Sequence, residues 1–293
     1  MATIIITGAN GFIGSELVRY LSAKGHAIRA LSRSKPAGLP ENVTFYEYDL
    51  STEPPEEPFI MADALIHCAY VKYSPQQKNA HALNRSGTYR LLETSRRNEI
   101  KKFIYFSSFS SHAESLSHYG QSKFEIEKIF DNSRDLILKP GLVLGKRGTY
   151  ANLQQVILSR RIIPVFGDGR QPVQSIYIDD LLACIGHALE YNICGTFPLA
   201  EKEILPLEAA VKIISETARK KTNIVRIPFS LALGIIKLAG MFNLKFPVSR
   251  ENLLSLKSDI SYDTSKTEEV FKVNIRPFRE SVKELANSPS SPF

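Results

Sequence analysis

The sequence predicts an α/β protein with a doubly wound parallel sheet and a smaller C-terminal lobe. Three observations support this prediction. Short apolar runs alternate with amphipathic stretches from residue 3 to about 145, a glycine-rich turn follows the first apolar run, and the alternation ends beyond Gly145. Such alternation is typical of successive βαβ units, whose right-handed crossovers place helices on both faces of a parallel sheet.

Six strands and three helices are expected in the first half of the chain. The expected strands are Thr3 to Thr7, Ala27 to Leu31, Val43 to Tyr48, Ala64 to Cys68, Phe103 to Ser107 and Leu136 to Lys139. The expected helices lie near Ile13 to Ala23, Gln77 to Arg97 and Tyr119 to Asn132. Each helix joins two strands, as a parallel sheet requires.

The second half of the chain predicts a separate lobe with one return to the sheet. A helix is expected near Ala151 to Arg161, and the turn-rich segment 166–172 then reverses the chain. Ser175 to Tyr191 and Thr196 to Ala200 look like a return to the first domain. The predicted division is a domain built on the parallel sheet (1–145 with 174–202), a smaller lobe (146–173 with 203–287) and a flexible tail (288–293).

Composition and charge exclude several classes of protein. The formal net charge of +7 is spread along 293 residues in short basic clusters, which indicates solvated faces and no nucleic-acid surface. Cys68, Cys184 and Cys194 form no CxxC pair and have no histidine at metal-ligand spacing, so neither a disulfide framework nor a metal site is expected. This cysteine usage fits a reducing, cytoplasmic setting.

No membrane span or export signal is expected. Met1 leads directly into the first strand, without the charged and apolar regions of a signal peptide. The longest apolar segment, Phe229 to Phe242, contains Lys237 and is shorter than the roughly 20 residues of a membrane-spanning helix. We expect a packed helix here, with a role at a membrane surface left open.

The turn after the first strand predicts a dinucleotide site. Gly8, Gly11 and Gly14 have the spacing G-x-x-G-x-x-G between a strand and a helix. The first glycine permits the tight turn, the second lets the backbone approach a pyrophosphate, and the third allows close packing of helix on strand. The free N–H groups at the start of the helix favour an anion. An ordinary glycine-rich turn is the alternative, which the order strand, turn, helix disfavours.

The end of the second strand indicates NADP in preference to NAD. An NAD site usually places an acid there to bind the ribose 2′-hydroxyl, but the chain has no Asp or Glu between Glu16 and Glu41. Arg33 and Lys35 stand there and could bind a 2′-phosphate, although Arg33 could also be a plain surface cation. Asp49, followed by Leu50, is expected to bind the adenine amino group.

A tyrosine and a lysine at helical spacing predict the catalytic groups. Tyr119 and Lys123 are four residues apart, so they project from the same face of a helix. A neighbouring cation would favour the phenolate of Tyr119, and Lys123 could also hold the nicotinamide ribose. Ser108 follows the fifth strand, at the edge where doubly wound sheets bind ligands, and could hydrogen-bond a substrate carbonyl. An exposed helix pair and a plain Ser-rich loop, with Ser107, Ser110 and Ser111, are the alternatives.

These motifs together resemble the extended short-chain dehydrogenases/reductases of the NAD-dependent epimerase/dehydratase family. The likeness covers nearly the whole chain. It rests on segments 7–14, 49–50, 67–69, 84–88, 107–108, 139–141 and 177–181, on Tyr119 with Lys123, and on 262–266, which resembles the family's C-terminal signature.

The resemblance implies that residues 1–145 with 174–202 form a Rossmann-type NAD(P)-binding domain and that residues 146–173 with 203–287 form a substrate-binding lobe. It also implies roles for further residues. Asn84 corresponds to the family's structural or proton-relay asparagine, and Ala69 would line the cofactor groove, beside the core residues His67 and Cys68. Pro140, Leu142 and Val143 would pack on the nicotinamide amide. The complete set of expected cofactor contacts is Gly8, Asn10, Gly11, Phe12, Ile13, Gly14, Arg33, Asp49, Leu50, Cys68, Ala69, Tyr119, Lys123, Pro140, Leu142 and Val143.

Departures from the family pattern narrow the reaction. Phe109 and Ser110 stand where dehydratases carry an Asp-Glu pair, which disfavours dehydration. Val173 stands where nucleotide-sugar epimerases carry an arginine for the substrate diphosphate, and Arg170 and Arg250, which could substitute, are out of register. The leading hypothesis is therefore an NADPH-dependent reductase or dehydrogenase acting on a carbonyl or alcohol.

Two other hypotheses stay open. One is a nucleotide-sugar epimerase or 4-keto reductase, and the other is a redox-silent NADPH-binding scaffold resembling the short-chain-dehydrogenase-like accessory subunit of respiratory complex I. The expected partners are a small carbonyl substrate or a nucleotide sugar. A homodimer through the helices at 77–97 and 119–132 is a further possibility, because family members often dimerise there.

Overall fold

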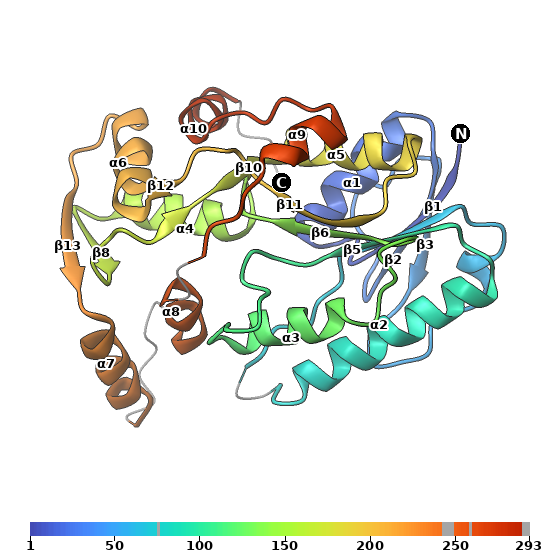
Figure 1. Ribbon diagram of the computed structural model, residues 1–293, viewed down its shortest axis with the longest axis horizontal. Coiled ribbons are helices and arrows are strands. Elements are labelled where there is room, and N and C mark those ends of the chain that lie inside the picture. The colour runs from blue at the N-terminus through green and yellow to red at the C-terminus, as the bar shows by residue number, and fades with distance from the viewer. Residues whose placement is uncertain (75–76, 242–248, 258–259, 289–293) are drawn as a thin grey trace.

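The computed structural model describes residues 1–74, 77–241, 249–257 and 260–288, and its centre is a seven-stranded parallel sheet (Figure 1). The strand order is β11-β6-β5-β4-β1-β2-β3. The strands are β1 (Thr3–Thr7), β2 (Ala27–Ser32), β3 (Val43–Glu47), β4 (Ala64–His67), β5 (Lys102–Phe106), β6 (Leu136–Pro140) and β11 (Gly195–Leu199). Every neighbouring pair in this sheet is parallel.

Helices cover both faces of the sheet (Figure 1). One face carries α1 (Phe12–Ala23) and α5 (Ile178–Glu190), and the other carries α2 (Ala80–Arg97) and α3 (His118–Glu127). Side chains alternate along each strand, so Ile4 and Ile6 join the core on the first face while Ile5 joins the core on the second. Continuous apolar strands are therefore buried on both sides, as the sequence predicts.

The remaining elements gather mainly at one end of the sheet and along the α5 side (Figure 1). They are α4 (Gly148–Ser159), α6 (Leu207–Thr217), α7 (Phe229–Met241), α8 (Arg250–Lys257), α9 (Ser265–Phe271) and α10 (Phe278–Asn287), whereas the short helix η1 (Glu57–Phe59) leads into β4. Three strand pairs accompany them: β7 (Leu142–Leu144) with β10 (Ser175–Tyr177), β8 (Ile162–Phe166) with β13 (Asn223–Ile227), and β9 (Pro172–Val173) with β12 (Leu205–Pro206).

The structure confirms the predicted fold class and shifts some boundaries. The return to the sheet is confirmed, because β11 pairs with β6 and α5 packs on α1. The predicted helix from Tyr119 to Asn132 ends earlier, at Glu127. The next backbone bonds, from Ile129 N to the Ile126 carbonyl oxygen (3.1 Å) and from Phe130 N to that of Glu127 (3.3 Å), span three residues, so the helix ends in a tighter turn.

Two buried carboxylates attach the C-terminal segment to the sheet. Glu201 accepts hydrogen bonds from the Ser175 hydroxyl (2.6 Å) and from the backbone N of Phe278 (2.7 Å). Asp180 accepts from the backbone N of Arg276 (2.9 Å) and pairs with its guanidinium (2.9 Å). Burial raises the pKa of both acids, and these donors act in the opposite direction. The segment after α9 is thereby held against α5.

Helix α7 is packed on one side and exposed on the other. Ala232 is buried near Phe166 and Leu253, but Leu231 and Leu238 are more than half exposed. Phe242, the last residue of the predicted helix, and all of the predicted tail except Ser288 lie outside the described residues. Within the described chain, no helix combines the length and apolarity needed to cross a membrane.

Candidate active site

The predicted site residues lie on one edge of the sheet, where the parallel strands end. The glycine turn follows β1, Arg33 follows β2, and the segment from Cys68 to Tyr70 follows β4. Ser108 follows β5, and Leu142 follows β6 after a one-residue break. Loops at the carboxyl ends of a doubly wound sheet form its ligand-binding crevice, so residues far apart in sequence share one surface.

The glycine turn has the close packing that its spacing predicts. Gly8 has a φ of +69°, and a Cβ there would lie 2.7 Å from the backbone N of Ala69. A Cβ on Gly14 would lie 2.2 Å from the carbonyl oxygen of Gly8. Helix α1 then begins after Gly11 with no side-chain cap, so its first N–H groups are available to an anion. The turn therefore fits the pyrophosphate of a dinucleotide.

The neighbours of the turn hold it against two other loops. The Asn10 amide donates to the carbonyl oxygen (2.5 Å) and the hydroxyl (3.0 Å) of Ser34, beyond β2. Arg147 donates to the carbonyl oxygen of Asn10 at 3.2 Å, and Phe12 packs beside Gly145 and Gly148. Asn10 and Phe12 thus fix the shape of the turn, while Ile13 lies in the first turn of α1.

Arg33 and Asp49 face each other at the outer end of the site. The Nε atom of Arg33 lies 3.9 Å from Oδ2 of Asp49, and the arginine side chain is 81% exposed. The other carboxylate oxygen of Asp49 accepts from the backbone N (2.8 Å) and hydroxyl (2.5 Å) of Ser51. These bonds, followed by the Arg33 charge, lower the pKa of Asp49. Asp49 is thus an ionised acceptor, and most of the Arg33 guanidinium stays open to solvent.

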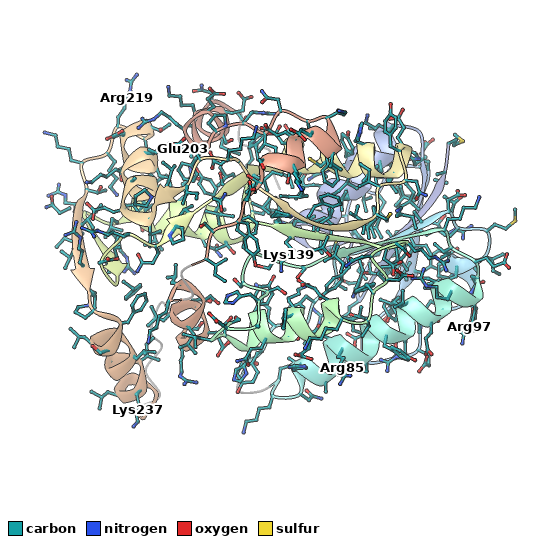
Figure 2. The ribbon with its side chains drawn as sticks, in the orientation of Figure 1. Arg85, Arg97, Lys139, Glu203, Arg219 and Lys237 are labelled. Atoms are coloured by element: carbon teal, nitrogen blue, oxygen red, sulfur yellow. The ribbon has the colours of Figure 1, made fainter. Side chains whose placement is uncertain are left out.

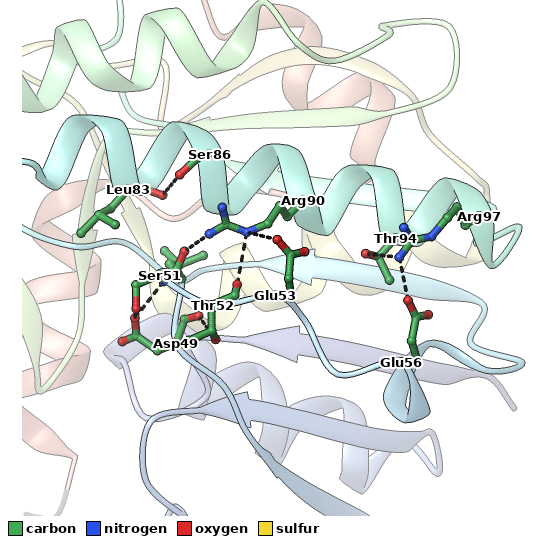
Figure 3. A network of polar contacts seen from close by, with 11 residues as sticks. Asp49, Ser51, Thr52, Glu53, Glu56, Leu83, Ser86, Arg90, Thr94 and Arg97 are labelled. Carbon is green, nitrogen blue, oxygen red and sulfur yellow. Dashed lines mark hydrogen bonds and ion pairs between the residues drawn. The ribbon is translucent and has the colours of Figure 1, made fainter.

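Arg90 fixes the segment after β3 to helix α2 (Figure 3). Its guanidinium donates to the carbonyl oxygens of Leu50 (2.6 Å) and Thr52 (3.2 Å) and lies 3.6 Å from the Glu53 carboxylate. A Cβ on Gly87 would lie only 2.6 Å from the Leu50 carbonyl oxygen, which shows how closely α2 approaches. Leu50 is therefore a buried support for Asp49.

Asn84 is a buried residue that holds a loop. Its amide accepts from the backbone N of Val71 and donates to the carbonyl oxygen of Val71, both at 2.8 Å. The carbonyl oxygen of Asn84 accepts from Thr88, whose hydroxyl contacts Nε2 of His67 at 2.9 Å. Both ends of the Asn84 amide are used within the protein. This geometry supports the structural reading of Asn84 over the proton-relay reading.

His67 is a neutral core residue, in agreement with its predicted place in the strand. It is buried, and its Nδ1 contacts the Thr7 hydroxyl at 2.7 Å. Burial lowers the pKa of His67 to about 3, and the Lys123 charge adds to this shift. Cys68 follows β4, and burial raises the pKa of its thiol. Neither residue is therefore charged near neutral pH.

The structure brings Ser108, Tyr119 and Lys123 together. Tyr119 and Lys123 lie on α3, whose N-cap Ser117 accepts from the backbone N of Gly120 at 3.1 Å. Burial raises the pKa of Tyr119, and the nearby Ser108 side chain acts on the phenol in the opposite direction with a smaller effect. Tyr119 is thus protonated near neutral pH, with Ser108 as its polar neighbour.

The predicted effect of Lys123 on Tyr119 is wrong in this structure. The Lys123 ammonium donates to the carbonyl oxygen of Phe106 and lies over the rings of Tyr70 (4.7 Å) and Tyr105 (4.6 Å). Burial lowers the pKa of Lys123 to about 7. A partly neutral ammonium bound to other groups does not offset the burial of Tyr119, so the pKa of Tyr119 is raised and not lowered.

Sequence reasoning missed an acid and a base that hold the serine loop around Ser108. Glu127 accepts from the hydroxyls of Ser107 and Ser111, and its other oxygen lies 3.4 Å from Nζ of Lys139. Figure 2 shows Lys139 near the centre of the molecule, and its ammonium also donates to the Ser111 carbonyl oxygen at 2.5 Å. Glu127 follows Lys123 by four residues, as Lys123 follows Tyr119, so helical spacing was a usable signal.

The C-terminal segment reaches the same serine loop. The Tyr262 hydroxyl lies 3.2 Å from the carbonyl oxygens of both Phe109 and Ser111, and its ring lies 4.6 Å from the Phe109 ring. Burial raises the pKa of Tyr262 to about 12, so the hydroxyl is a donor. The loop that carries Ser108 is thereby fixed from α3, β6 and the C-terminal segment.

Residues at the end of β6 and in β7 line the edge of the site. Pro140 is buried, and its carbonyl oxygen accepts from the backbone N of Phe109 at 3.2 Å. Leu142 and Val143 are half-buried in β7. Val173 lies in β9, paired with Leu205, and Arg170 is exposed in the preceding turn. Among the described residues, no group of three or more His, Cys, Asp or Glu side chains could hold a metal ion.

Replacing Glu127 by glutamine is expected to destabilise the protein by about 2 kcal/mol, because the buried Lys139 ammonium would lose its counter-charge. The measurement is the free energy of unfolding in urea. Glu125→Gln is the matched control. Glu125 is an exposed residue of the same helix, and its carboxylate forms an ion pair with Lys128. Equal stability of the two variants would show that the Glu127–Lys139 pair contributes nothing.

The parallel sheet, the glycine turn and the Ser108, Tyr119 and Lys123 group define an enzyme of the short-chain dehydrogenase/reductase type, with a nicotinamide dinucleotide as cofactor. The model of the NAD dependent epimerase/dehydratase family matches residues 4–195. The chain belongs to this family, whose members are NAD-dependent enzymes.

Two relatives match part of this chain in sequence, and one solved structure matches its fold. The UDP-glucose 4-epimerase of Vibrio cholerae is 26% identical over 65% of this chain and 68% of its own length. A putative dihydroflavonol 4-reductase of Synechocystis is 33% identical over 36% of this chain and 32% of its own length. The crystal structure of UDP-N-acetylglucosamine 4-epimerase from Bacillus cereus superposes with a TM-score of 0.69 at 18% identity, covering 97% of this chain and 98% of the other.

Proposed function

We propose that the protein transfers hydride between NADP(H) and a carbonyl or alcohol substrate. The observation that carries this proposal is a protonated Tyr119 with the Ser108 side chain beside it, at the edge of the sheet where the glycine turn lies. A carbonyl oxygen placed at this pair would accept hydrogen bonds from both hydroxyl groups. The two bonds would polarise the carbonyl for addition at its carbon.

The chain's own residues account for the proton in this reaction. When bound, the dinucleotide supplies the hydride that reduces the substrate carbon. Tyr119 donates its phenolic proton to the substrate oxygen and takes it back in the oxidation direction. Lys123, with a pKa of about 7, lies one helical turn away and would hold the nicotinamide ribose. Asn84 keeps the loop after β4 in place.

The choice of NADP rests on Arg33. Its guanidinium is 81% exposed at the end of β2, beside an acid that lies on the next strand's loop. The family name indicates NAD, and solved structures that share this fold hold NAD, so the comparisons support NAD better than NADP. An open guanidinium favours a 2′-phosphate, because charge-assisted hydrogen bonds to phosphate are strong.

Arg33→Ala is expected to weaken NADPH binding by about tenfold to a hundredfold and to leave NADH binding within about twofold. The two dissociation constants are measured from the fluorescence of each reduced cofactor. Arg19→Ala is the control, because Arg19 is an exposed arginine that pairs with Glu16 on α1. Equal losses for NADPH and NADH would remove the argument for NADP.

A nucleotide-sugar epimerase is the second candidate, and the relative from Vibrio cholerae favours it. An epimerase needs a cation for the substrate diphosphate. Helix α8 begins at Arg250, and the adjacent Glu251 accepts from the backbone N of His118 at 2.8 Å, so α8 lies beside the start of α3. Arg250 is therefore a better candidate for this role than the exposed Arg170.

One experiment separates the candidates. The protein is mixed with NADPH and a panel of ketones and UDP-sugars, and the nicotinamide absorbance is followed together with product analysis. Consumption of NADPH supports the reductase, and product without net consumption supports the epimerase. Binding of NADPH without any product would contradict both and leave a scaffold role.

We further propose how the chain is organised. Residues 1–145 with 174–202 bind the dinucleotide, and residues 146–173 with 203–287 bind the substrate. The three unpaired cysteines fit a reducing compartment such as the cytoplasm. A homodimer through α2 and α3 stays a prediction, which light scattering after size-exclusion chromatography would test.

A further inference from the structure

Tyr70 is an aromatic residue of the site to which the sequence motifs assign no role. Its ring is nearly perpendicular to that of Tyr119, at 83°, with the centroids 5.0 Å apart. The same ring lies 4.7 Å from the Lys123 ammonium. Tyr70 is thus in contact with both groups that the proposed reaction uses on α3.

The Lys123 ammonium lies between two aromatic rings. The second ring belongs to Tyr105, 4.6 Å away, and the Phe106 carbonyl oxygen accepts a hydrogen bond from Nζ. Lys123 is only 4% exposed, so its charge has lost most of its hydration. Cation–π contacts with desolvated ammonium groups are among the stronger ones, and here they replace part of that hydration.

The two rings are supported in different ways. Tyr105 is a core residue of β5, packed between His67 (5.8 Å) and Phe130 (4.9 Å). Tyr70 stands on the loop after β4, and the bidentate amide of Asn84 holds the next residue, Val71. Asn84 therefore holds the loop that carries Tyr70, and the Tyr70 ring contacts both Lys123 and Tyr119.

We infer that Tyr70 is a positioning residue whose ring holds the Lys123 ammonium against Tyr105 and sets the orientation of the Tyr119 ring. The effect on turnover rests on the proposed function. The effect on Lys123 does not, because it follows from the contacts in the protein alone. This inference also gives Asn84 a physical role, since Asn84 fixes the loop that carries the ring.

Other titratable groups lie near Lys123, and their charge states must be known when its pKa is compared between variants. They are Cys68 and His67 at the end of β4, Tyr105 in β5, and Tyr119 and Glu127 on α3. His67 is neutral near pH 7, because its pKa is about 3. The Cys68 thiol and the phenols are protonated there, because burial raises the pKa of each. Glu127 is the acid in this group, and the substitutions below leave it unchanged.

Three variants of the full chain test the inference. Tyr70→Leu keeps an apolar side chain and removes the ring, and Tyr70→Phe keeps the ring and removes the hydroxyl group. Tyr73→Leu is the matched control, because Tyr73 lies on the same loop but contacts the His118 ring (4.7 Å) at the start of α3. The melting temperature of each variant checks that it folds.

The primary measurement is the pKa of Lys123 by NMR of ¹⁵N-labelled lysine side chains, assigned with Lys123→Arg. Loss of the cation–π contact destabilises the charged form, so Tyr70→Leu is expected to lower this pKa by about half a unit to one unit. Tyr70→Phe and Tyr73→Leu are expected to stay within about 0.2 units of the wild type. With a substrate identified in the panel of ketones and UDP-sugars, kcat is expected to fall about tenfold for Tyr70→Leu and to stay unchanged for Tyr70→Phe and Tyr73→Leu.

The outcomes separate this inference from the proposed function. An unchanged Lys123 pKa in a folded Tyr70→Leu variant would overturn the inference. An equal shift in Tyr70→Phe would overturn the role of the ring in favour of the hydroxyl group. The expected pKa shift in a protein without any turnover would support the positioning of Lys123 while the proposed function fails.

Discussion

Tyr119→Phe is expected to lower kcat by about a thousandfold while leaving the dissociation constant of NADPH within about twofold. The substitution removes the hydroxyl group on which Ser108 acts and keeps the ring that packs against Tyr70 at 5.0 Å. The phenolic proton is needed in the transition state and contributes little to cofactor binding. Kinetics with the active substrate and a fluorescence titration with NADPH measure the two quantities.

The control for this experiment is Tyr89→Phe. Tyr89 lies on α2 with half of its surface exposed. Its substitution also removes a phenolic hydroxyl group, but at a position outside the site. Full activity is expected for this variant. Substantial turnover by Tyr119→Phe would show that another group supplies the proton, and the assignment of the catalytic tyrosine would then be wrong.

Gly14→Ala is expected to abolish measurable binding of the dinucleotide and to lower the free energy of unfolding by about 2–3 kcal/mol. The new Cβ would lie 2.2 Å from the carbonyl oxygen and 2.8 Å from the carbonyl carbon of Gly8. Both are backbone atoms of the turn, so the turn itself must move. Movement of α1 away from β1 would misplace the N–H groups that bind the pyrophosphate.

Gly234→Ala is the matched control for this substitution. A Cβ on Gly234, in α7, would meet no atom within 4 Å, and alanine is the better helix former. This variant should bind NADPH normally and unfold at an equal or higher urea concentration. Normal NADPH binding by Gly14→Ala would contradict the role of the glycine turn.

Much of the fold could be predicted because the local signals agree with the tertiary structure. The strand of Ile4, Ile5 and Ile6 is apolar on both faces, and it is buried by helices on both sides. The boundary of α3 could not be predicted in this way. Beyond Glu127 the backbone bonds to the carbonyl oxygens of Ile126 and Glu127 span three residues instead of four, and the periodicity of the sequence does not show this tightening.

The class of this protein can be read from local features of the chain, namely the glycine spacing before α1, the apolar strands and the helical spacing of Tyr119 and Lys123. The electrostatics of the site depend on the fold as a whole. Burial depends on residues distant in sequence, and it raises the pKa of Tyr119 and lowers that of Lys123 to about 7. Tyr70 and Lys139 joined the site for the same reason, because the strand ends of a parallel sheet bring separate loops to one edge.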